Sequence, residues 1–225
     1  MQLALFYQHN INDTTKLAIW KIEEDAYFFL EHVPLQREIT HPHKRLQHLA
    51  GRYLLRLLFS DFPFEEILIA DTKKPYLPHE QYHFSISHCG NYAAAIVSST
   101  QRVGIDIEIP TERVLRITHK FLNAEELKEF NIEGSLFKDQ GSRIKISNLR
   151  LATTLWSAKE AMFKWWGWGA VDFSEMLRIN HFELKEEGII QTRFIRQSMN
   201  VPLELHYKLM PDICLVWLST EAANI

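Results

Sequence analysis

The stretch Gly104-Ile105-Asp106-Ile107-Glu108 alternates apolar and acidic side chains after its first glycine. Because alternate residues of a strand face the same side, this pattern predicts a strand whose two carboxylates point together. Two like charges on one face repel each other and are costly to desolvate, and a divalent cation would remove that cost. The simpler alternative is the solvent-facing side of a half-exposed strand.

The segment from Trp156 to Lys164 reads W-S-A-K-E-A-M-F-K and predicts a helix. Glu160 and Lys164 are four residues apart and therefore lie on one helical face. As an ordinary surface pair they would contribute about 0.2–0.5 kcal/mol. Together with the two acids of the predicted strand they offer three carboxylates and one ammonium, enough to hold a magnesium ion and a diphosphate.

The composition limits the class of protein. With 225 residues, 46% of them hydrophobic, the chain can bury the core of one domain or of two small ones. The formal net charge of −3 gives no overall attraction to nucleic acid or to a membrane, so any anion site must be a local patch. The two cysteines predict a reducing compartment without disulfides. The N-terminus does not resemble a signal peptide, and no apolar run approaches the roughly 20 residues of a membrane span, which indicates a cytoplasmic protein.

Hydrophobic periodicity predicts a mixture of helices and strands. Strands are expected at 3–7, 17–22, 66–70, 82–86, 92–98, 103–109, 176–182, 189–195, 203–209 and 213–218, and helices at 42–61 and 149–166. Asn123 and Glu126 form a capping pair that would open a further helix. Residues 131–148 are polar and lack periodicity, which predicts a mobile loop.

Both halves of the chain contain helices followed by several strands, which predicts an α+β fold. We expect two similar, pseudo-symmetric lobes, 1–110 and 111–225, each a small, mainly antiparallel sheet with packed helices. The acids of the predicted strand end the first lobe, whereas Glu160 and Lys164 lie in the second. A site built from both would lie in the cleft between the lobes, a common place for a ligand.

Several further residues have both an ordinary and a functional interpretation. His88 follows a strand and precedes Gly90, so it is either a structural hydrogen-bonding residue or a phosphate contact. Lys74 lies in a basic turn, K-K-P-Y, that is either a solvated loop or an anion site. Arg45 and Arg52 lie on the polar side of the helix at 42–61, which is either a solvated face or a clamp for a terminal phosphate. The tryptophans near Trp166 are expected to be mostly core, with some exposed for a protein partner.

Taken in order, these motifs resemble the 4'-phosphopantetheinyl transferases, specifically the two-lobed monomeric type that activates peptide and polyketide synthases. The order is a basic helix, a Lys-Pro turn, Ser-His-x-Gly, G-I-D-I-E and W-S-x-K-E-x-x-x-K, and it spans roughly residues 37–169. Two positions depart from the family. Lys73 replaces the usual glycine before Lys-Pro, and Cys89 replaces a small hydroxyl residue.

The resemblance implies a role for each matching residue. Asp106, Glu108 and Glu160 would bind Mg²⁺, and Lys164 would face the diphosphate of coenzyme A. His88 would contact a phosphate and Lys74 the nucleotide end. The 3'-phosphate would be reached by Arg52 and, with a looser alignment, by Arg45 and Arg37.

The implied reaction transfers 4'-phosphopantetheine from coenzyme A to a serine of an apo acyl or peptidyl carrier protein and releases adenosine 3',5'-bisphosphate. The residues alone leave three alternatives open. They are a non-catalytic coenzyme A or nucleotide-binding protein, an RNA-binding module, and a magnesium-dependent phosphatase or nucleotidyl transferase. The near-neutral charge and the absence of an RNA-reading motif speak against RNA binding. The resemblance implies a monomer.

Overall fold

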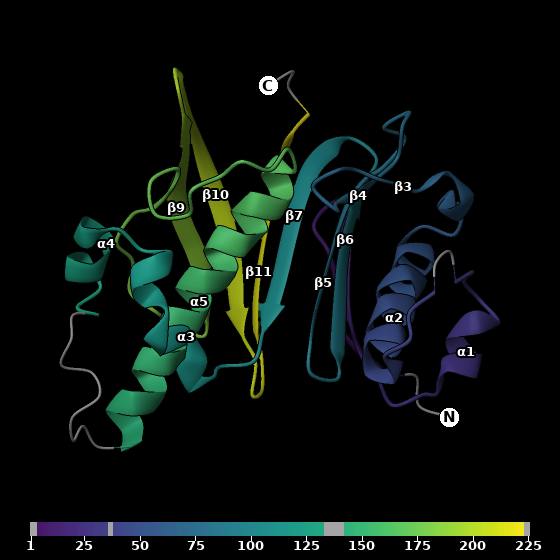
Figure 1. Cartoon of the computed structure of the whole chain (residues 1–225), viewed down its shortest axis with the longest axis horizontal. Coiled ribbons are helices and arrows are strands. Elements are labelled where there is room, and N and C mark those ends of the chain that lie inside the picture. The colour runs from purple at the N-terminus through teal and green to yellow at the C-terminus, as the bar shows by residue number, and fades with distance from the viewer. Residues whose placement is uncertain (1–3, 36–37, 133–141, 223–225) are drawn as a thin grey trace. The chain divides into compact units, whose positions relative to one another are not determined.

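The computed structural model describes residues 4–35, 38–132 and 142–222 and has an α+β fold with antiparallel sheets, as the sequence predicts (Figure 1). Within the described residues, no helix is both long and apolar enough to cross a membrane. The chain divides into two compact units, one formed by Met1–Ile107 with Ser219–Ile225 and the other by Glu108–Leu218.

The first unit is built on a four-stranded antiparallel sheet in the order β1-β2-β6-β5. Its strands are β1 (Leu5–Asn10), β2 (Thr15–Lys21), β5 (His83–Cys89) and β6 (Tyr92–Ser98). The remaining elements are α1 (Ala26–Leu30), α2 (Pro42–Leu58), the 3-10 turn η1 (Phe64–Glu66), the short pair β3 (Leu68–Ile69) and β4 (Pro75–Tyr76), and β7 (Gln101–Glu108).

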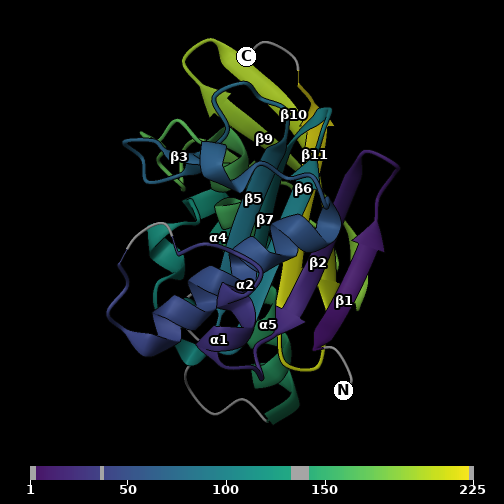
Figure 2. The same ribbon diagram turned by 90° about the vertical axis from the view of Figure 1, so that its right-hand side faces the viewer.

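Helix α2 lies across this sheet with α1 beside it (Figure 2). Its apolar positions recur at helical spacing, and Leu49, Leu54 and Leu55 are completely buried. The helix approaches β5 closely at Gly51, where an added Cβ would lie 2.7 Å from Ile86 Cγ2. A larger residue there would force the helix away from the strand.

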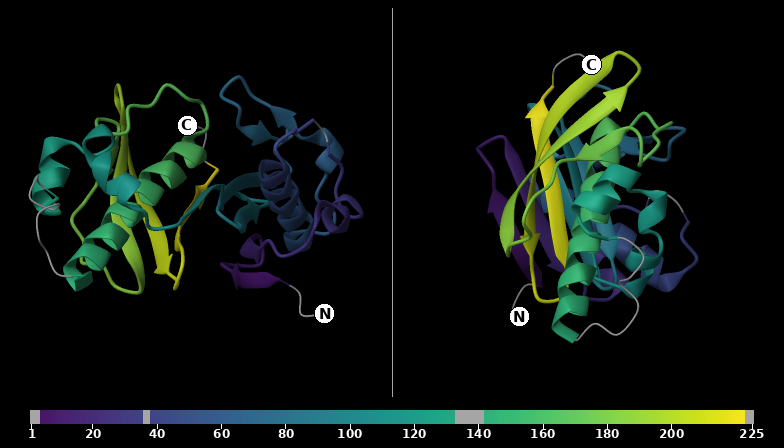
Figure 3. Two further views of the ribbon diagram at one scale, coloured as in Figure 1. Left: turned by 60° about the horizontal axis from the view of Figure 1, so that its bottom comes forward. Right: turned by 90° about the vertical axis from the view of Figure 1, so that its left-hand side faces the viewer.

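The second unit places one long helix, α5 (Ser142–Trp166), across one face of a sheet (Figure 3). The strands, in the order β11-β10-β9-β8, are β11 (Cys214–Glu221), β10 (Met199–Leu209), β9 (Glu187–Arg196) and β8 (Leu177–Ile179). The shorter helical elements are α3 (Glu112–Arg116), η2 (Thr118–Lys120) and α4 (Ala124–Glu129).

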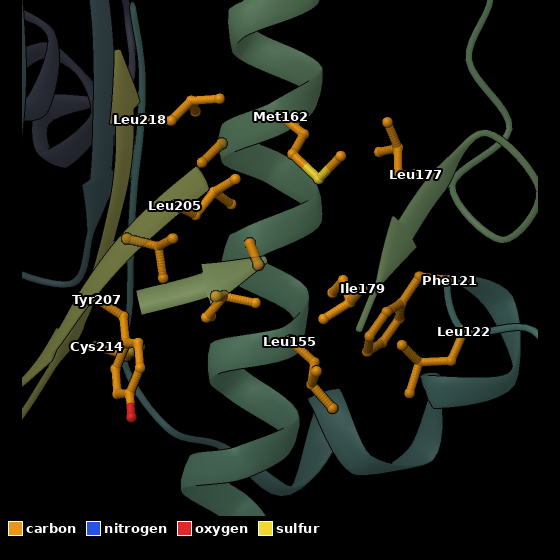
Figure 4. Packing of buried hydrophobic residues seen from close by; sticks show 14 of the residues in the cluster. Phe121, Leu122, Leu155, Met162, Leu177, Ile179, Leu205, Tyr207, Cys214 and Leu218 are labelled. Atoms are coloured by element: carbon orange, nitrogen blue, oxygen red, sulfur yellow. The ribbon is translucent and has the colours of Figure 1, made fainter. Parts of the chain in front are cut away.

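The core of the second unit lies between α5 and the sheet (Figure 4). Leu155 and Met162 extend from α5 toward apolar side chains of the strands, such as Leu177 and Leu205. All four are fully buried. Burying a side chain of this kind stabilises the fold by about 1.5–3 kcal/mol, so these contacts hold α5 against the sheet.

One expected element is wrong in part. The loop predicted at 131–148 is already helical from Ser142, and residues 133–141 lie outside the described part of the chain. Ile146, in this part of α5, is 55% exposed, and the residues before Leu149 show no helical periodicity in the sequence. The five-residue helices α1 and α3 were not predicted for the related reason that they are too short to show a helical period.

Candidate active site

Asp106 lies on β7 and is only 3% exposed, so the interpretation of its strand as a half-solvated edge fails at this residue. Ser87 Oγ on β5 donates a hydrogen bond of 2.8 Å to Asp106 Oδ1. The same hydroxyl accepts a hydrogen bond of 3.3 Å from the backbone N–H of Ile107. Asp106 is therefore a buried carboxylate with one oxygen fixed by a neighbouring strand, a condition typical of metal ligands and catalytic acids.

The sequence of β5 explains this contact. Side chains alternate along a strand, so Phe84 and Ile86 point to the α2 side while Ser85 and Ser87 point to the other side. There Ser85 Oγ accepts from Ile105 N at 3.2 Å, which parallels the contact of Ser87. The two serines thus accept hydrogen bonds from backbone N–H groups of β7. These contacts fix the position of Asp106 along β7 relative to β5.

Glu160 and Lys164 lie on α5 at half-buried positions, one helical turn apart. Trp156 and Phe163 are also half-buried and lie on the same side of the helix. The opposite side carries the fully buried core residues, so the predicted pair lies on the half-buried side of α5, where Trp156 and Phe163 pack against that core. Glu108, also half-buried, begins the second unit.

Taken one at a time, neither unit contains, among its described residues, a group of three His, Cys, Asp or Glu side chains that could hold a metal ion. The three predicted acids divide between the units, because Asp106 belongs to the first and Glu108 and Glu160 to the second. Their chemistry fits Mg²⁺, which prefers carboxylate oxygens supported by hydrogen bonds of the kind that Ser87 makes to Asp106. The three-acid site remains a prediction.

The basic turn keeps its geometry despite the departure at Lys73. This residue has φ 65°, in the left-handed region that favours glycine, and its N–H donates to Ala70 O at 2.8 Å. Lys74 O then accepts from Ala70 N at 3.0 Å. The lysine thus adopts the conformation for which a glycine is suited, at a cost of about 1–2 kcal/mol, and Lys74 is placed just before β4.

Three basic side chains of the first unit have pKa values lowered chiefly by burial, and two of them were not anticipated from the sequence. The pKa of Lys74 falls to about 8 because the ammonium is buried and because Arg102 is near. Burial also lowers the pKa of Arg102, partly offset by Glu80. The pKa of His83 is lowered mainly by burial, with Arg102 and Lys74 contributing. An anion would offset the repulsion between the cations of Lys74 and Arg102, so this basic cluster (Lys74, His83 and Arg102) favours a phosphate ligand.

The basic residues of α2 are partly buried. Arg52 is 6% exposed, and its Nη1 lies 3.3 Å from His48 Nδ1. Arg45 is half-buried, and within the described part of the chain its Nε has no hydrogen-bond partner. Both guanidinium groups are thus less solvated than an ordinary polar face would leave them. Arg37 lies outside the described residues.

His88 is exposed near the end of β5, opposite Ala93 of β6. The following turn is attached to the start of α2, where Gln47 Nε2 donates to Gly90 O at 2.8 Å. Gly90 has φ 46°, a left-handed conformation that suits its glycine. His88 therefore lies exposed beside a turn that is hydrogen-bonded to α2.

The tryptophans divide as the sequence suggests. Trp165 is completely buried and Trp166 is 7% exposed, whereas Trp168, just after α5, is 66% exposed. The chain leaves the helix through Gly167 at φ 76°. Trp166 Nε1 donates to Gly169 O at 3.1 Å and fixes the loop that carries Trp168.

Lys159 was missed as a notable residue. Its side chain is 0% exposed and forms a salt bridge of 2.7 Å with Glu126 of α4. The sequence could have indicated its importance, because Lys159 falls on the same helical face as the apolar residues Leu155 and Met162. A charged residue on an apolar face predicts a buried partner.

Comparison with known proteins gives one family. Residues 102–209 match the model of the 4'-phosphopantetheinyl transferase superfamily. Enterobactin synthase component D of Escherichia coli (strain K12) is 32% identical over 125 residues, which are 54% of this chain and 54% of the relative. Its counterparts in Escherichia coli O157:H7 and Shigella flexneri are 31% identical over the same share. The chain thus matches about half the length of these curated relatives.

The resemblance inferred from the motifs is confirmed at the level of the superfamily. The matched range contains Asp106, Glu108, Glu160 and Lys164. Residues 102–209 therefore match the 4'-phosphopantetheinyl transferase superfamily.

Proposed function

We propose that this protein transfers the 4'-phosphopantetheine group of coenzyme A to a serine of an apo acyl or peptidyl carrier protein. The serine oxygen would bond to the phosphorus that bears pantetheine, and the bond from that phosphorus to the adenosine-side phosphate oxygen would break. The serine proton goes to a base, and adenosine 3',5'-bisphosphate leaves. The observation that carries this proposal is the superfamily match, which includes all three predicted acids and Lys164.

Asp106, Glu108 and Glu160 are the residues that would hold a magnesium ion, and the ion would supply positive charge to the diphosphate. The buried carboxylate of Asp106 supports this assignment, because Ser87 fixes one of its oxygens. A buried carboxylate gains from a cation more than an exposed one does.

Glu160 and Lys164 have complementary roles in the proposal. Glu160, directly or through a water molecule, would accept the serine proton as general base. Lys164 would stabilise the negative charge that develops on the departing bisphosphate. Their half-buried positions one turn apart on α5 support a joint role, because both side chains reach solvent on the same stripe of the helix.

The remaining basic residues would bind the nucleotide portion of coenzyme A. Lys74 and His88 would contact its phosphates, and Arg52, Arg45 and Arg37 are proposed for the 3'-phosphate. The lowered pKa of Lys74, caused by burial and by Arg102, supports an anion site, because phosphate would relieve the repulsion in the basic cluster. We further propose that the protein acts as a monomer.

The test is intact-protein mass spectrometry of apo carrier proteins incubated with this protein, coenzyme A and Mg²⁺. The panel would hold one carrier each from fatty-acid, polyketide and peptide synthesis. A mass gain of one phosphopantetheine group, lost when a chelator is added, is the expected result. No gain on any carrier, from folded protein that binds coenzyme A, would instead support the non-catalytic coenzyme A-binding alternative.

A further inference from the structure

The second unit contains a fully satisfied, buried charge cluster. Lys159 Nζ donates to both carboxylate oxygens of Glu126, at 2.9 and 2.7 Å, to Phe173 O at 2.9 Å and to Leu177 O at 2.5 Å. An ammonium has three protons, so four oxygen partners leave it no unused donor. The Lys159 side chain is 0% exposed and that of Glu126 3%.

Glu126 is equally occupied. Besides Lys159, its Oε1 accepts from Ile179 N at 2.8 Å, and its Oε2 accepts from Asn123 N at 3.0 Å, as part of the capping box that opens α4. The pair thus connects three segments that are distant in sequence. They are the start of α4, the middle of α5 and the chain that leads into β8.

Stability alone does not explain a charge pair at this place. Desolvating two charges offsets most of their mutual attraction, and replacing a buried pair by apolar residues of similar volume is often neutral or stabilising. The neighbours Leu155 and Met162 on the same face of α5 are apolar and fully buried, so an apolar residue would suit the position of Lys159. The charge pair adds hydrogen bonds of fixed geometry, which hold α5 at one rotation about its axis and one position along it. Apolar contacts, in contrast, tolerate small shifts of the helix.

We propose that the Glu126–Lys159 pair positions Glu160. Glu160 is the next residue along α5, and it lies on the half-buried side of the helix. A small rotation or slide of α5 would move its carboxylate by a similar amount. This inference rests on the proposed function, in which Glu160 binds the metal ion and accepts a proton. Lys159 and Glu126 are positioning residues and touch neither substrate nor metal.

The decisive variant is the double substitution Lys159→Met with Glu126→Leu, which keeps the volume and removes both charges. We expect it to fold with a lower Tm, because the N–H groups of Ile179 and Asn123 lose their acceptor. Loss of positioning should lower kcat about 10- to 100-fold while the KM for the carrier stays nearly constant. Mn²⁺ binding, measured by electron paramagnetic resonance without any turnover, should weaken about tenfold or more. Hydrogen exchange of the α5 amides near Glu160 should become faster.

Leu155→Ala is the matched control. It creates a cavity beneath the same helix and should lower stability, but it leaves the charge pair intact, so kcat and Mn²⁺ affinity measured well below its Tm should stay at wild-type values. If the double variant does not fold, the single variant Glu126→Gln, which retains hydrogen-bonding groups at Glu126, takes its place with the same three measurements.

Wild-type kcat, Mn²⁺ affinity and exchange rates in the double variant would overturn the proposal. Equal losses in Leu155→Ala would also overturn it, because they would assign the effect to general destabilisation. A wild-type protein that modifies no carrier would refute the proposed function. The Mn²⁺ and exchange measurements would still decide whether the pair positions Glu160.

Discussion

Ser87 Oγ donates a hydrogen bond of 2.8 Å to Asp106 Oδ1 while it accepts one of 3.3 Å from Ile107 N. One hydroxyl of β5 therefore fixes both the backbone and the acidic side chain of β7. Ser85 makes only the contact with the backbone, since its Oγ accepts a hydrogen bond of 3.2 Å from Ile105 N. Both serines are buried, so substituting each in turn separates the contact with the Asp106 side chain from the contacts with the β7 backbone.

Ser87→Ala should impair function more than stability. Removing its hydroxyl leaves the Ile107 N–H without this acceptor and should lower the free energy of unfolding by about 1–3 kcal/mol. Losing the support of Asp106 should reduce transfer about tenfold or more. Ser85→Ala should show a similar loss of stability in urea titrations but near-normal transfer. Equal activity in the two variants would refute the role assigned to Ser87.

Asp106→Asn and Glu160→Gln should each abolish transfer, because the amides keep the shape but remove the charge that a cation requires. Circular dichroism should show a folded protein in both cases. Glu125→Gln, which changes an exposed acid in the first turn of α4, serves as the control and should transfer at the wild-type rate. Retained activity in either folded site variant would exclude the proposed metal site.

The affinity for coenzyme A should fall as the pH rises above about 8, the pKa to which burial and Arg102 lower Lys74. A bound phosphate favours the protonated ammonium, so binding raises the pKa of Lys74 and takes up a proton above pH 8. The affinity should therefore weaken by up to about tenfold per pH unit there. Calorimetric titration measures this slope.

Lys74→Arg supplies the control for the pH prediction, since a guanidinium stays charged across this range. Its affinity profile between pH 7 and 9 should be flatter than that of the wild type. The pKa of His83 is lowered by burial, so its imidazole is already neutral above pH 8 and adds no slope. Identical slopes in the two proteins would remove Lys74 from the binding site.

Trp165 and Trp168 should respond to alanine substitution in opposite ways. Trp165 is completely buried and packs edge-on against Phe194 with ring centroids 5.9 Å apart, so Trp165→Ala should cost about 3–5 kcal/mol of unfolding free energy. Trp168 is 66% exposed, and Trp168→Ala should change stability by less than about 0.5 kcal/mol. Thermal unfolding of both variants checks this contrast, and a large loss in Trp168→Ala would contradict it.

Local patterns in the sequence predict the elements that carry enough residues to show a period. The predicted strand at 92–98 coincides with β6, and the capping pair Asn123 and Glu126 opens α4 as expected. The end of α5 at Trp166, before Gly167, is also as predicted. The helices α1 and α3, of five residues each, were missed because they are too short to show a helical period, and the start of α5 was missed because residues 142–148 show none.

The sequence by itself determined the superfamily, the α+β class and the residue types of the candidate site, because motif spacing and side-chain periodicity are local properties. Only the tertiary structure placed Ser87 under Asp106, gathered Arg102 and His83 near Lys74, and buried Lys159 against Glu126. These contacts join residues that are far apart in the chain, and hydrogen bonds and charge repulsion act over a few ångströms of space. A sequence shows which groups are present, whereas packing decides which of them come within that range.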